Sequence, residues 1–402
     1  MTTPSSFAAY SRRLLAFIER GAAADEAQFT SLARELFALQ FAHVAPYRAL
    51  CEARRVPPDS LTDWRQIPAV PTAAFKELEL TSLAPVERTT VFHSSGTTEQ
   101  RTSRHFHSAE SLEVYVASLL PWFARHVLPA EVGRVCPSAP VVRSDAEPAR
   151  WGQTHPTFLC LAPPPEQAPR SSLVHMFATV SRAFGAPGSR FVATAGADNS
   201  WSLDFTAAHA ALRQVDQSAQ PLILLGTAFM FVNLLDALEQ RGLSITLPPG
   251  SRVMETGGYK GRSREMPKTE LHALITSRLG VPSLHLVCEY GMSELSSQAY
   301  DRVARDEWQV TSDASAAASQ NTEHGTRRFR FPPWCRALVI SPETGREVAD
   351  GETGLLRILD LANVRSVMAI QTEDLAVRCG KGFELIGRAS QAEARGCSLL
   401  AA

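Results

Sequence analysis

Apolar residues recur at helical spacing in the first part of the chain. Between residues 7 and 53 they include Leu32, Leu36 and Leu39, and this spacing places them on one face of a helix. A short β-type run from Thr89 to His93 then ends in a cluster of Ser, Gly and Thr residues. The pattern predicts a helical N-terminal region, followed by a strand that runs into a polar loop.

The middle of the chain alternates strand and helix patterns. Apolar runs at 191–197 and 221–227 are each followed by a helical segment, and Gly242 suits the end of the second helix. Two further apolar runs end in loops of Gly, acidic and hydroxyl residues near Thr256 and Tyr290. This alternation predicts a largely parallel sheet. In such sheets, ligands bind beyond the carboxyl ends of the strands.

The last section changes to short, hairpin-like strands. It begins at about Thr326, and Gly380-Lys381-Gly382 has the composition of a turn between two strands. We expect four segments: a helical region packed on the core, an α/β core, a β-rich subdomain, and a tail. They cover residues 1–85, 86–325, 326–388 and 389–402.

Composition excludes several classes of protein. Lys and Arg number 40 and Asp and Glu 41, which leaves a formal charge of -1, so no positive field favours nucleic acid. The most apolar stretch, 222–235, is too short to span a membrane, and the start of the chain lacks the apolar core of a secretory signal. The scattered cysteines form no C-x-x-C pair, which disfavours disulfides and zinc. We expect a cytoplasmic protein without a membrane span.

A hydroxyl-rich turn is the first candidate site. Backbone N–H and side-chain hydroxyl groups of Ser94-Ser95-Gly96-Thr97-Thr98 are suited to binding phosphate oxygens. Taken alone, these residues are equally typical of a solvated turn, and they lack the glycine and lysine spacing of a Walker loop. Both interpretations fit this segment by itself.

Four further motifs follow the turn along the chain. They are Thr256-Gly257-Gly258-Tyr259-Lys260, Glu289-Tyr290-Gly291-Met292-Ser293-Glu294, Gln371-Thr372-Glu373-Asp374 and Gly387-Arg388. This succession, from about Val91 to Arg388, resembles the adenylate-forming superfamily of acyl-CoA synthetases, peptide-synthetase adenylation domains and luciferases. The residues of the first two of these four motifs, together with the short C-terminus, look most like the LuxE-type acyl-protein synthetases of bacterial fatty-acid reductase systems.

The resemblance implies an α/β fold, the large N-terminal domain of the superfamily. This domain has mixed, largely parallel sheets flanked by helices, together with a β-rich final section. The resemblance also implies that the usual small C-terminal domain with a catalytic lysine is missing, because few residues follow Arg388. Lys260, Lys268 or an arginine of the phosphate loop would then stabilise the developing charge.

By the same resemblance, Ser94, Ser95, Gly96, Thr97 and Thr98 would surround the β- and γ-phosphates of ATP. The family loop usually continues through Gly and Pro to Lys, whereas this chain continues to Arg101 and Arg104. Either arginine would supply positive charge without the geometry of a lysine.

The glycine and tyrosine motifs would hold the adenine. Gly257 and Gly258 lack a Cβ, so the backbone can approach the adenine plane closely, and Tyr259 offers an aromatic face. Tyr290, followed by Gly291, would stack on the adenine. A glycine turn after a strand is also an ordinary structural feature.

The remaining motif residues would bind the metal and the ribose. Ser293 keeps the hydroxyl of the family's threonine, and Glu294 would help to hold Mg²⁺, a hard cation that suits a carboxylate beside phosphates. Asp374 would accept hydrogen bonds from both ribose hydroxyls, and Arg388 would reach ribose or phosphate. An exposed acid at a helix start is the ordinary alternative for Glu294.

Cys397 resembles the cysteine near the C-terminus on which LuxE-type proteins accept the acyl group. A thiol is partly ionised near neutral pH and can attack a mixed anhydride to give a thioester. A buried or disordered tail cysteine is the alternative. His105 and His107 share one face of an expected strand, so they are ordinary side chains or part of a metal or acyl-pocket site. His93 has no assigned role.

Together these features predict a ligase. It would activate a fatty or aryl acid as acyl-AMP with ATP and Mg²⁺ and transfer the acyl group to a thiol: Cys397, coenzyme A or a phosphopantetheine-bearing carrier protein. The expected partners are the small carboxylic acid and an acyl carrier protein, acyltransferase or reductase. One alternative is an acyltransferase that moves an acyl or aryl group between coenzyme A and a carrier protein through Cys397 without ATP. The other is a non-catalytic nucleotide-binding subunit. No motif specifies the acid, the final acceptor or the oligomeric state.

Overall fold

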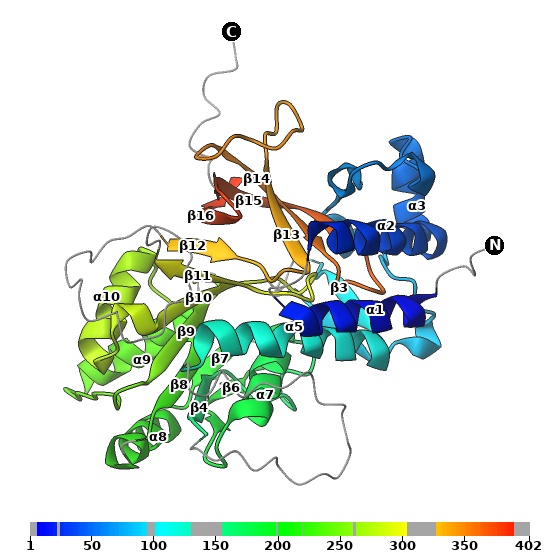
Figure 1. The fold of residues 1–402 in the computed structure, drawn as a ribbon. Coiled ribbons are helices and arrows are strands. Elements are labelled where there is room, and N and C mark those ends of the chain that lie inside the picture. Colours follow the sequence, from blue (N-terminus) through cyan, green and yellow to red (C-terminus); the bar gives the residue numbers. More distant parts are fainter. Residues whose placement is uncertain are drawn as a thin grey trace. The chain divides into compact units, whose positions relative to one another are not determined.

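The computed structural model describes residues 6–21, 25–94, 101–129, 155–197, 200–218, 220–259, 263–303 and 327–389. The chain forms two compact units. The first comprises Met1–Leu119, Met292–Ala299 and Thr326–Ala402, and the second comprises Leu120–Gly291 and Tyr300–Gly325. Figure 1 shows their helices and strands, coloured along the sequence. The expected division of the chain into four segments stays a prediction.

The first unit begins with the helices that the sequence predicts. They are α1 (Phe7–Arg20), α2 (Glu26–His43) and α3 (Ala45–Ala53). The side chains of Ser6 and Asp25 cap α1 and α2 by accepting hydrogen bonds from backbone N–H groups of the first turn. The predicted apolar face of α2, with Leu32, Leu36 and Leu39, is buried. Shorter pieces follow: η2 (Pro58–Ser60), η3 (Trp64–Gln66), β1 (Val70–Pro71), α4 (Ala74–Glu77) and η4 (Pro85–Glu87).

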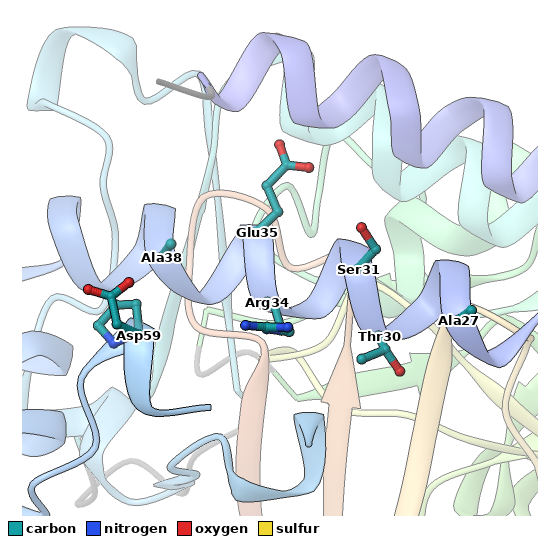
Figure 2. A pocket seen from close by; sticks show the side chains of 8 residues that line it. Ala27, Thr30, Ser31, Arg34, Glu35, Ala38 and Asp59 are labelled. Atoms are coloured by element: carbon teal, nitrogen blue, oxygen red, sulfur yellow. The ribbon is translucent and has the colours of Figure 1, made fainter. Parts of the chain in front are cut away.

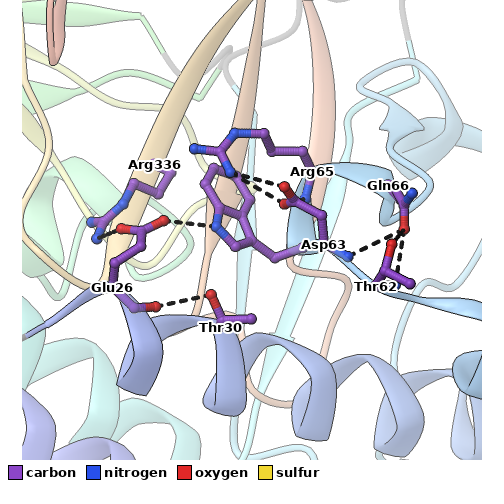
Figure 3. A network of polar contacts seen from close by, with 8 residues as sticks. Glu26, Thr30, Thr62, Asp63, Arg65, Gln66 and Arg336 are labelled. Carbon is purple, nitrogen blue, oxygen red and sulfur yellow. Dashed lines mark hydrogen bonds and ion pairs between the residues drawn. The ribbon is translucent and has the colours of Figure 1, made fainter.

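A polar network joins α2 to the rest of the first unit. Glu26, in the first turn of α2, accepts hydrogen bonds from the Trp64 indole at 2.8 Å and from the Arg336 guanidinium at 3.1 Å. Figure 3 shows the Glu26 carboxylate beside the Arg336 guanidinium. Asp63 and Gln66 form a capping box around η3. The carboxylate of Glu26 therefore supports the helix end and links it to the start of a strand.

The β-rich part of the first unit is antiparallel. Its strands lie in the order β13 (Cys335–Ile340), β14 (Thr353–Asp360), β15 (Ala369–Cys379), β16 (Gly382–Arg388) and β12 (Arg327–Arg330), and β1 pairs in parallel with β15. Cys379 pairs with Gly382 across the predicted turn. Gly380 has a φ of 59° there, which glycine adopts without strain. The predicted hairpin is confirmed.

A separate hairpin of β2 (Thr90–His93) and β3 (Arg104–His107) also belongs to the first unit. β2 confirms the short strand expected before the hydroxyl-rich turn. Helix α5 (Ala109–Val127) follows the hairpin and continues into the second unit.

The second unit contains the predicted parallel sheet. Its strands lie in the order β5 (Arg190–Phe191), β4 (Thr157–Leu161), β8 (Leu222–Thr227), β9 (Arg252–Thr256) and β10 (Leu286–Tyr290), each parallel to the next. Every residue of β8 is buried, which explains its continuous apolar run. The connecting helices and pieces are α7 (Ser172–Phe184), α8 (Phe205–Ser218), α9 (Ala228–Gln240), α10 (Lys268–Leu279) and η5 (Ser283–His285), and β11 (Ala299–Val303) follows β10.

One strand prediction was wrong in extent. The run 191–197 was expected to form a single strand, but β5 ends at Phe191 and β6 covers Ala193–Ala195. The chain leaves the parallel sheet there, because β6 pairs antiparallel with β7 (Trp201–Leu203). Elsewhere, no helix in the described part of the chain combines the length and apolar character needed to cross a membrane.

Candidate functional site

The β2–β3 hairpin carries the hydroxyl-rich turn at its tip. Ser94 and Ser103 close the base of this turn: the Ser94 N–H donates to the Ser103 carbonyl at 3.3 Å, and the Ser103 N–H donates to Ser94 Oγ at 3.0 Å. Ser95, Gly96, Thr97 and Thr98 lie outside the described residues. Of the predicted phosphate loop, the structure therefore describes Ser94, which fixes where the loop begins.

Ser293 lies beside the base of this turn, within the same unit, and Glu294 is bonded to it. Ser103 Oγ is 3.4 Å from Ser293 Oγ, although the two residues are 190 positions apart in sequence. The Ser293 hydroxyl donates to Glu294 Oε2 at 3.0 Å. Both residues are buried. The fold thus links the predicted metal-binding acid, through Ser293, to Ser103 at the base of the turn.

His105 of β3 holds the backbone at Ser293. Its Nδ1 lies 2.9 Å from the Ser293 carbonyl oxygen. Because a carbonyl oxygen only accepts, Nδ1 carries the proton and donates it. Burial lowers the pKa of His105 to about 4, and the bond to Ser293 opposes this shift. The ring is therefore neutral near pH 7. Its centroid is 4.2 Å from that of His107.

The turn after Glu294 is held by a buried carboxylate and a buried amide. Asp360 accepts hydrogen bonds from the Ser296 N–H at 2.9 Å, the Ser297 N–H at 2.8 Å and the Ser297 hydroxyl at 2.7 Å. Burial raises the pKa of Asp360, and these donors oppose the rise. The Asn363 side chain donates to the Glu294 carbonyl at 2.9 Å. Glu294 therefore sits in a segment whose backbone is held at several points.

The two arginines considered for the phosphate loop are bound to carboxylates. Arg101 pairs with Glu77 at 2.9 Å, and Arg104 pairs with Glu79 at 3.1 Å. The Arg101 and Glu77 side chains are 61% and 66% exposed, and an ion pair so exposed contributes little. Arg101 can therefore exchange Glu77 for another anion with a small change in free energy.

Asp374 and Arg388 are partners across β15 and β16 in the first unit. Arg388 Nε lies 3.6 Å from Asp374 Oδ1. The Asp374 N–H donates to Thr372 Oγ1 at 3.1 Å. The Arg388 side chain is 70% exposed and that of Asp374 19%. The guanidinium is thus accessible to a ligand, while the backbone of Asp374 is held by Thr372.

In the second unit, the glycine turn follows the carboxyl end of β9. Gly257 has a φ of 71°, which favours glycine. A Cβ on Gly257 or Gly258 would meet nothing within 4 Å, so a planar group has room to approach the backbone. Tyr259 packs against the core of this unit, and burial raises the pKa of its hydroxyl. Lys260 lies outside the described residues.

Three polar side chains form a row at the carboxyl ends of β8, β9 and β10. Thr227 pairs in register with Thr256, and Thr256 with Glu289. The Thr256 hydroxyl donates to the Glu289 carboxylate, whereas the buried Thr227 Oγ1 has no hydrogen-bond partner among the described residues. Tyr290, which is also buried, ends β10, and Gly291 follows it. The row lies where α/β sheets bind ligands.

The opposite face of the same strands carries a charged cluster that the sequence did not predict as a unit. Lys268 Nζ lies 2.7 Å from Cys288 Sγ and 3.9 Å from the Glu255 carboxylate, and His272 Nε2 is 3.3 Å from Glu255. Burial raises the pKa of Glu255, but Lys268 and His272 outweigh it, and the pKa falls below its usual value. Lys268 therefore compensates a buried carboxylate. Strand alternation was the signal that could have placed Glu255 and Cys288 on this face.

The buried carboxyl group of Glu289 leads us to expect an unusual dependence of the free energy of unfolding on pH. Burial raises its pKa to about 7, and the Thr256 hydroxyl opposes the rise. An unfolded glutamate titrates at about 4.3, so the folded state binds more protons between these values, and the free energy of unfolding falls as pH rises through this window. We expect Glu289→Gln to match the wild type at pH 5 and to exceed it at pH 8 by about 2 kcal/mol. Urea unfolding at both pH values measures this.

The matched control is Glu270→Gln, which removes an exposed carboxylate of α10 in the same unit. It should leave the pH profile unchanged. Parallel profiles for the wild type and Glu289→Gln would contradict the expected titration of Glu289.

A polar groove of about 470 Å³ lies along α2, away from the predicted site residues. Figure 2 shows Thr30, Ser31 and Arg34 along the helix, with Asp59 beside it. None of the sequence-predicted site residues lines this groove. The candidate site is therefore defined by the chemistry of its residues and not by the volume of this groove.

A sequence model of the family described as "Acyl-protein synthetase, LuxE" matches residues 176–402, more than half of the chain. The chain belongs to the LuxE acyl-protein synthetase family. The match covers the motifs from Thr256 to Arg388 and also Cys397, which lies outside the described residues. The predicted family resemblance is confirmed.

Two curated relatives of this LuxE-family chain carry the name long-chain-fatty-acid–luciferin-component ligase. The protein from Vibrio harveyi is 22% identical over 205 residues, and that from Aliivibrio fischeri is 21% identical over 208 residues. Each match covers 49% of this chain and 49% of the relative. The chain thus matches the curated relatives over about half of their length.

Solved structures of 2-hydroxyisobutyryl-CoA ligase share the fold. A post-adenylation state in complex with 2-HIB-AMP has a TM-score of 0.59 at 12% identity and covers 92% of this chain and 69% of the ligase. A thioesterification state with 2-HIB-AMP and CoA has a TM-score of 0.54 at 13% identity, with 96% and 69% covered. The predicted α/β fold of the adenylate-forming superfamily is confirmed for this LuxE-family chain.

The oxygen groups beside the hairpin fit a magnesium ion that is shared with phosphates. Mg²⁺ binds in such sites through one or two carboxylates together with substrate phosphates, and Glu294 and Ser293 offer a carboxylate and a hydroxyl. Within the described ranges, no group of three or more His, Cys, Asp or Glu residues is arranged to hold a metal. Any cation here would need further oxygens from its nucleotide, as this binding mode requires.

Proposed function

We propose that this LuxE-family chain activates a carboxylic acid with ATP and Mg²⁺ as its acyl adenylate and then passes the acyl group to a thiol. The observation that carries the proposal is the contact of the Ser293 hydroxyl with Ser103 at the base of the hydroxyl-rich turn, together with its hydrogen bond to the Glu294 carboxylate. Ser293 thus links a buried carboxylate to the base of a turn whose residues suit phosphate. When bound, Mg²⁺ would offset the charge that develops on the phosphates during the reaction.

The nucleotide-binding roles are proposed for each unit by itself. In the first unit, Glu294 would hold Mg²⁺, the turn that begins at Ser94 would hold the outer phosphates, and Asp374 and Arg388 would contact the ribose. In the second unit, the open sides of Gly257 and Gly258 suit the adenine plane, beside Tyr259 and Tyr290. Gly291 would continue the segment that follows Tyr290. The roles proposed for Ser95, Gly96, Thr97, Thr98 and Lys260 rest on sequence.

The family description and the names of the relatives favour a fatty acid as the substrate, and an aryl acid is the other class that the sequence leaves open. Cys397, coenzyme A or the phosphopantetheine thiol of a carrier protein would accept the acyl group. An acyl carrier protein, an acyltransferase or a reductase would then be the protein partner.

A second candidate function omits ATP and moves an acyl group between coenzyme A and a carrier protein through Cys397. The departure of the loop from the family's lysine pattern favours it, because Arg101 and Arg104 do not have the geometry of a lysine. Glu294 and Asp374, which match the family's nucleotide-binding residues, favour the use of ATP instead.

Acylation of Cys397 separates the two functions. Intact-protein mass spectrometry after incubation with Mg·ATP and a panel of fatty and aryl acids is expected to reveal an acyl adduct that requires ATP. Cys397→Ala should abolish it, because the thioester needs the thiolate. Cys379→Ala, which removes another cysteine of the first unit, is the matched control. An adduct that forms from acyl-CoA alone would favour the transferase, and an adduct that persists in Cys397→Ala would exclude Cys397 as the carrier.

A further inference from the structure

We propose that His105 is a positioning residue: it fixes the peptide that leads into Glu294 and so aims the Glu294 carboxylate at the cation of a bound magnesium–nucleotide complex. This inference rests on the proposed function, and it gives His105 a role that the sequence left open. His105 touches Ser293 and acts through it.

The backbone on both sides of Glu294 is fixed by a side chain. A peptide group is planar, so its carbonyl sets the orientation of the whole plane. The carbonyl before the Glu294 Cα belongs to Ser293 and accepts from His105 Nδ1 at 2.9 Å. The carbonyl after it belongs to Glu294 and accepts from Asn363 Nδ2 at 2.9 Å. With both planes held, φ and ψ of Glu294 are set, and the direction of its side chain follows.

The same strand connects this peptide to the phosphate loop. Ser103 and His105 are two positions apart in an extended segment, so their side chains lie on one face. Ser103 Oγ contacts the Ser293 hydroxyl, and its backbone N–H closes the base of the hydroxyl-rich turn on Ser94. Neighbouring residues of one hairpin therefore contact both the base of the turn and the segment that leads into Glu294.

Histidine suits this position because it donates a hydrogen bond without adding charge. His105 is 2% exposed, and a lysine or arginine there would place a cation in competition with Mg²⁺ for Glu294. The neighbouring His107 is equally buried, at 1%, but its Nδ1 contacts the Ser111 hydroxyl at 3.3 Å and not Ser293. His107 is therefore a matched control for the loss of a buried imidazole.

Mn²⁺ binding in the presence of ATP, followed by electron paramagnetic resonance, tests the role without turnover. Loss of a group that orients a metal ligand lowers metal affinity by about 10- to 100-fold, so we expect His105→Leu to weaken Mn²⁺ binding by about 10-fold. His105→Asn places an amide N–H near the position of Nδ1 and should restore most of the affinity. His105→Gln, whose amide lies nearer the position of Nε2, should not. His107→Leu should bind Mn²⁺ like the wild type.

The outcomes separate this inference from the proposed function. Equal Mn²⁺ affinity in the wild type, His105→Leu and His105→Gln would overturn the positioning role alone, as would an equal loss in His107→Leu. A wild-type protein that binds no Mn²⁺ in the presence of ATP would overturn both. If His105→Leu does not fold, the comparison of His105→Asn with His105→Gln decides, because both replace the ring by a neutral amide.

Discussion

Replacing Glu294 by Gln is expected to lower acid-dependent ATP–pyrophosphate exchange by about 100-fold or more. The substitution keeps the size of the side chain and an oxygen that can accept from Ser293, but it removes the negative charge that would hold the cation. Loss of one preorganised group that stabilises transition-state charge typically lowers kcat by about 100- to 1,000-fold. Incorporation of labelled pyrophosphate into ATP, in the presence of Mg²⁺ and an accepted acid, measures the effect.

Glu373→Gln is the matched control for this loss of charge. Glu373 is exposed and directly precedes Asp374 in the first unit, so its replacement alters the same net charge without touching the carboxylate beside the hairpin. Exchange should stay close to the wild-type rate. Normal exchange in Glu294→Gln would contradict the proposed metal-binding role.

Asp360→Ala is expected to lower the free energy of unfolding by about 3 kcal/mol or more. The Asp360 carboxylate accepts four hydrogen bonds, from the N–H groups of Ser296, Ser297 and Ala362 and from the Ser297 hydroxyl. Alanine leaves these buried donors without an acceptor, and each unsatisfied donor costs about 1–3 kcal/mol. Urea denaturation at pH 7, followed by circular dichroism, measures the change.

The size of this loss in the free energy of unfolding distinguishes the buried Asp360 carboxylate from an exposed carboxylate on the surface. Asp59→Ala removes an exposed carboxylate of η2 in the same unit and should change stability by less than about 0.5 kcal/mol. A similarly small change in Asp360→Ala would mean that water or neighbouring groups satisfy the donors, and that Asp360 does not hold the segment after Glu294.

Several helices and strands could be predicted from the sequence, because the local pattern of residues determines them. The buried face of α2 follows from the spacing of Leu32, Leu36 and Leu39. The continuous apolar run of β8 follows from burial on both faces, and the hairpin at Gly380 follows from turn composition. These are short-range properties, which a single sequence contains. The end of β5 at Phe191 was missed because pairing of β6 with β7 overrides the local strand pattern.

The candidate site was predictable only in part. Ser293 and Glu294 were predicted as site residues because their motif resembles that of a family, and the structure places Ser293 beside Ser103. His105 and Asp360 had no comparable signal. A buried histidine on a strand and an aspartate at a strand end are common, and their partners lie 188 and 64 positions away in sequence. Their roles depend on tertiary contacts that no local pattern encodes.

The charged cluster of the second unit illustrates the same limit. Lys268 was one of the residues predicted to stabilise the developing charge, but its neighbours were unknown from sequence. The structure gives it Glu255 and Cys288 as partners, and a buried carboxylate that loses its cation is strongly destabilising. The positive charge of Lys268 therefore contributes to the stability of this buried cluster.

The most direct test of the proposed function is acid-dependent ATP–pyrophosphate exchange by the full chain, across a panel of fatty and aryl acids. It detects the formation of acyl-AMP before any transfer to a thiol. We expect exchange that requires both Mg²⁺ and a particular class of acid. Absence of exchange with every acid, in a protein that becomes acylated by acyl-CoA without ATP, would contradict acid activation and identify the chain as an acyltransferase.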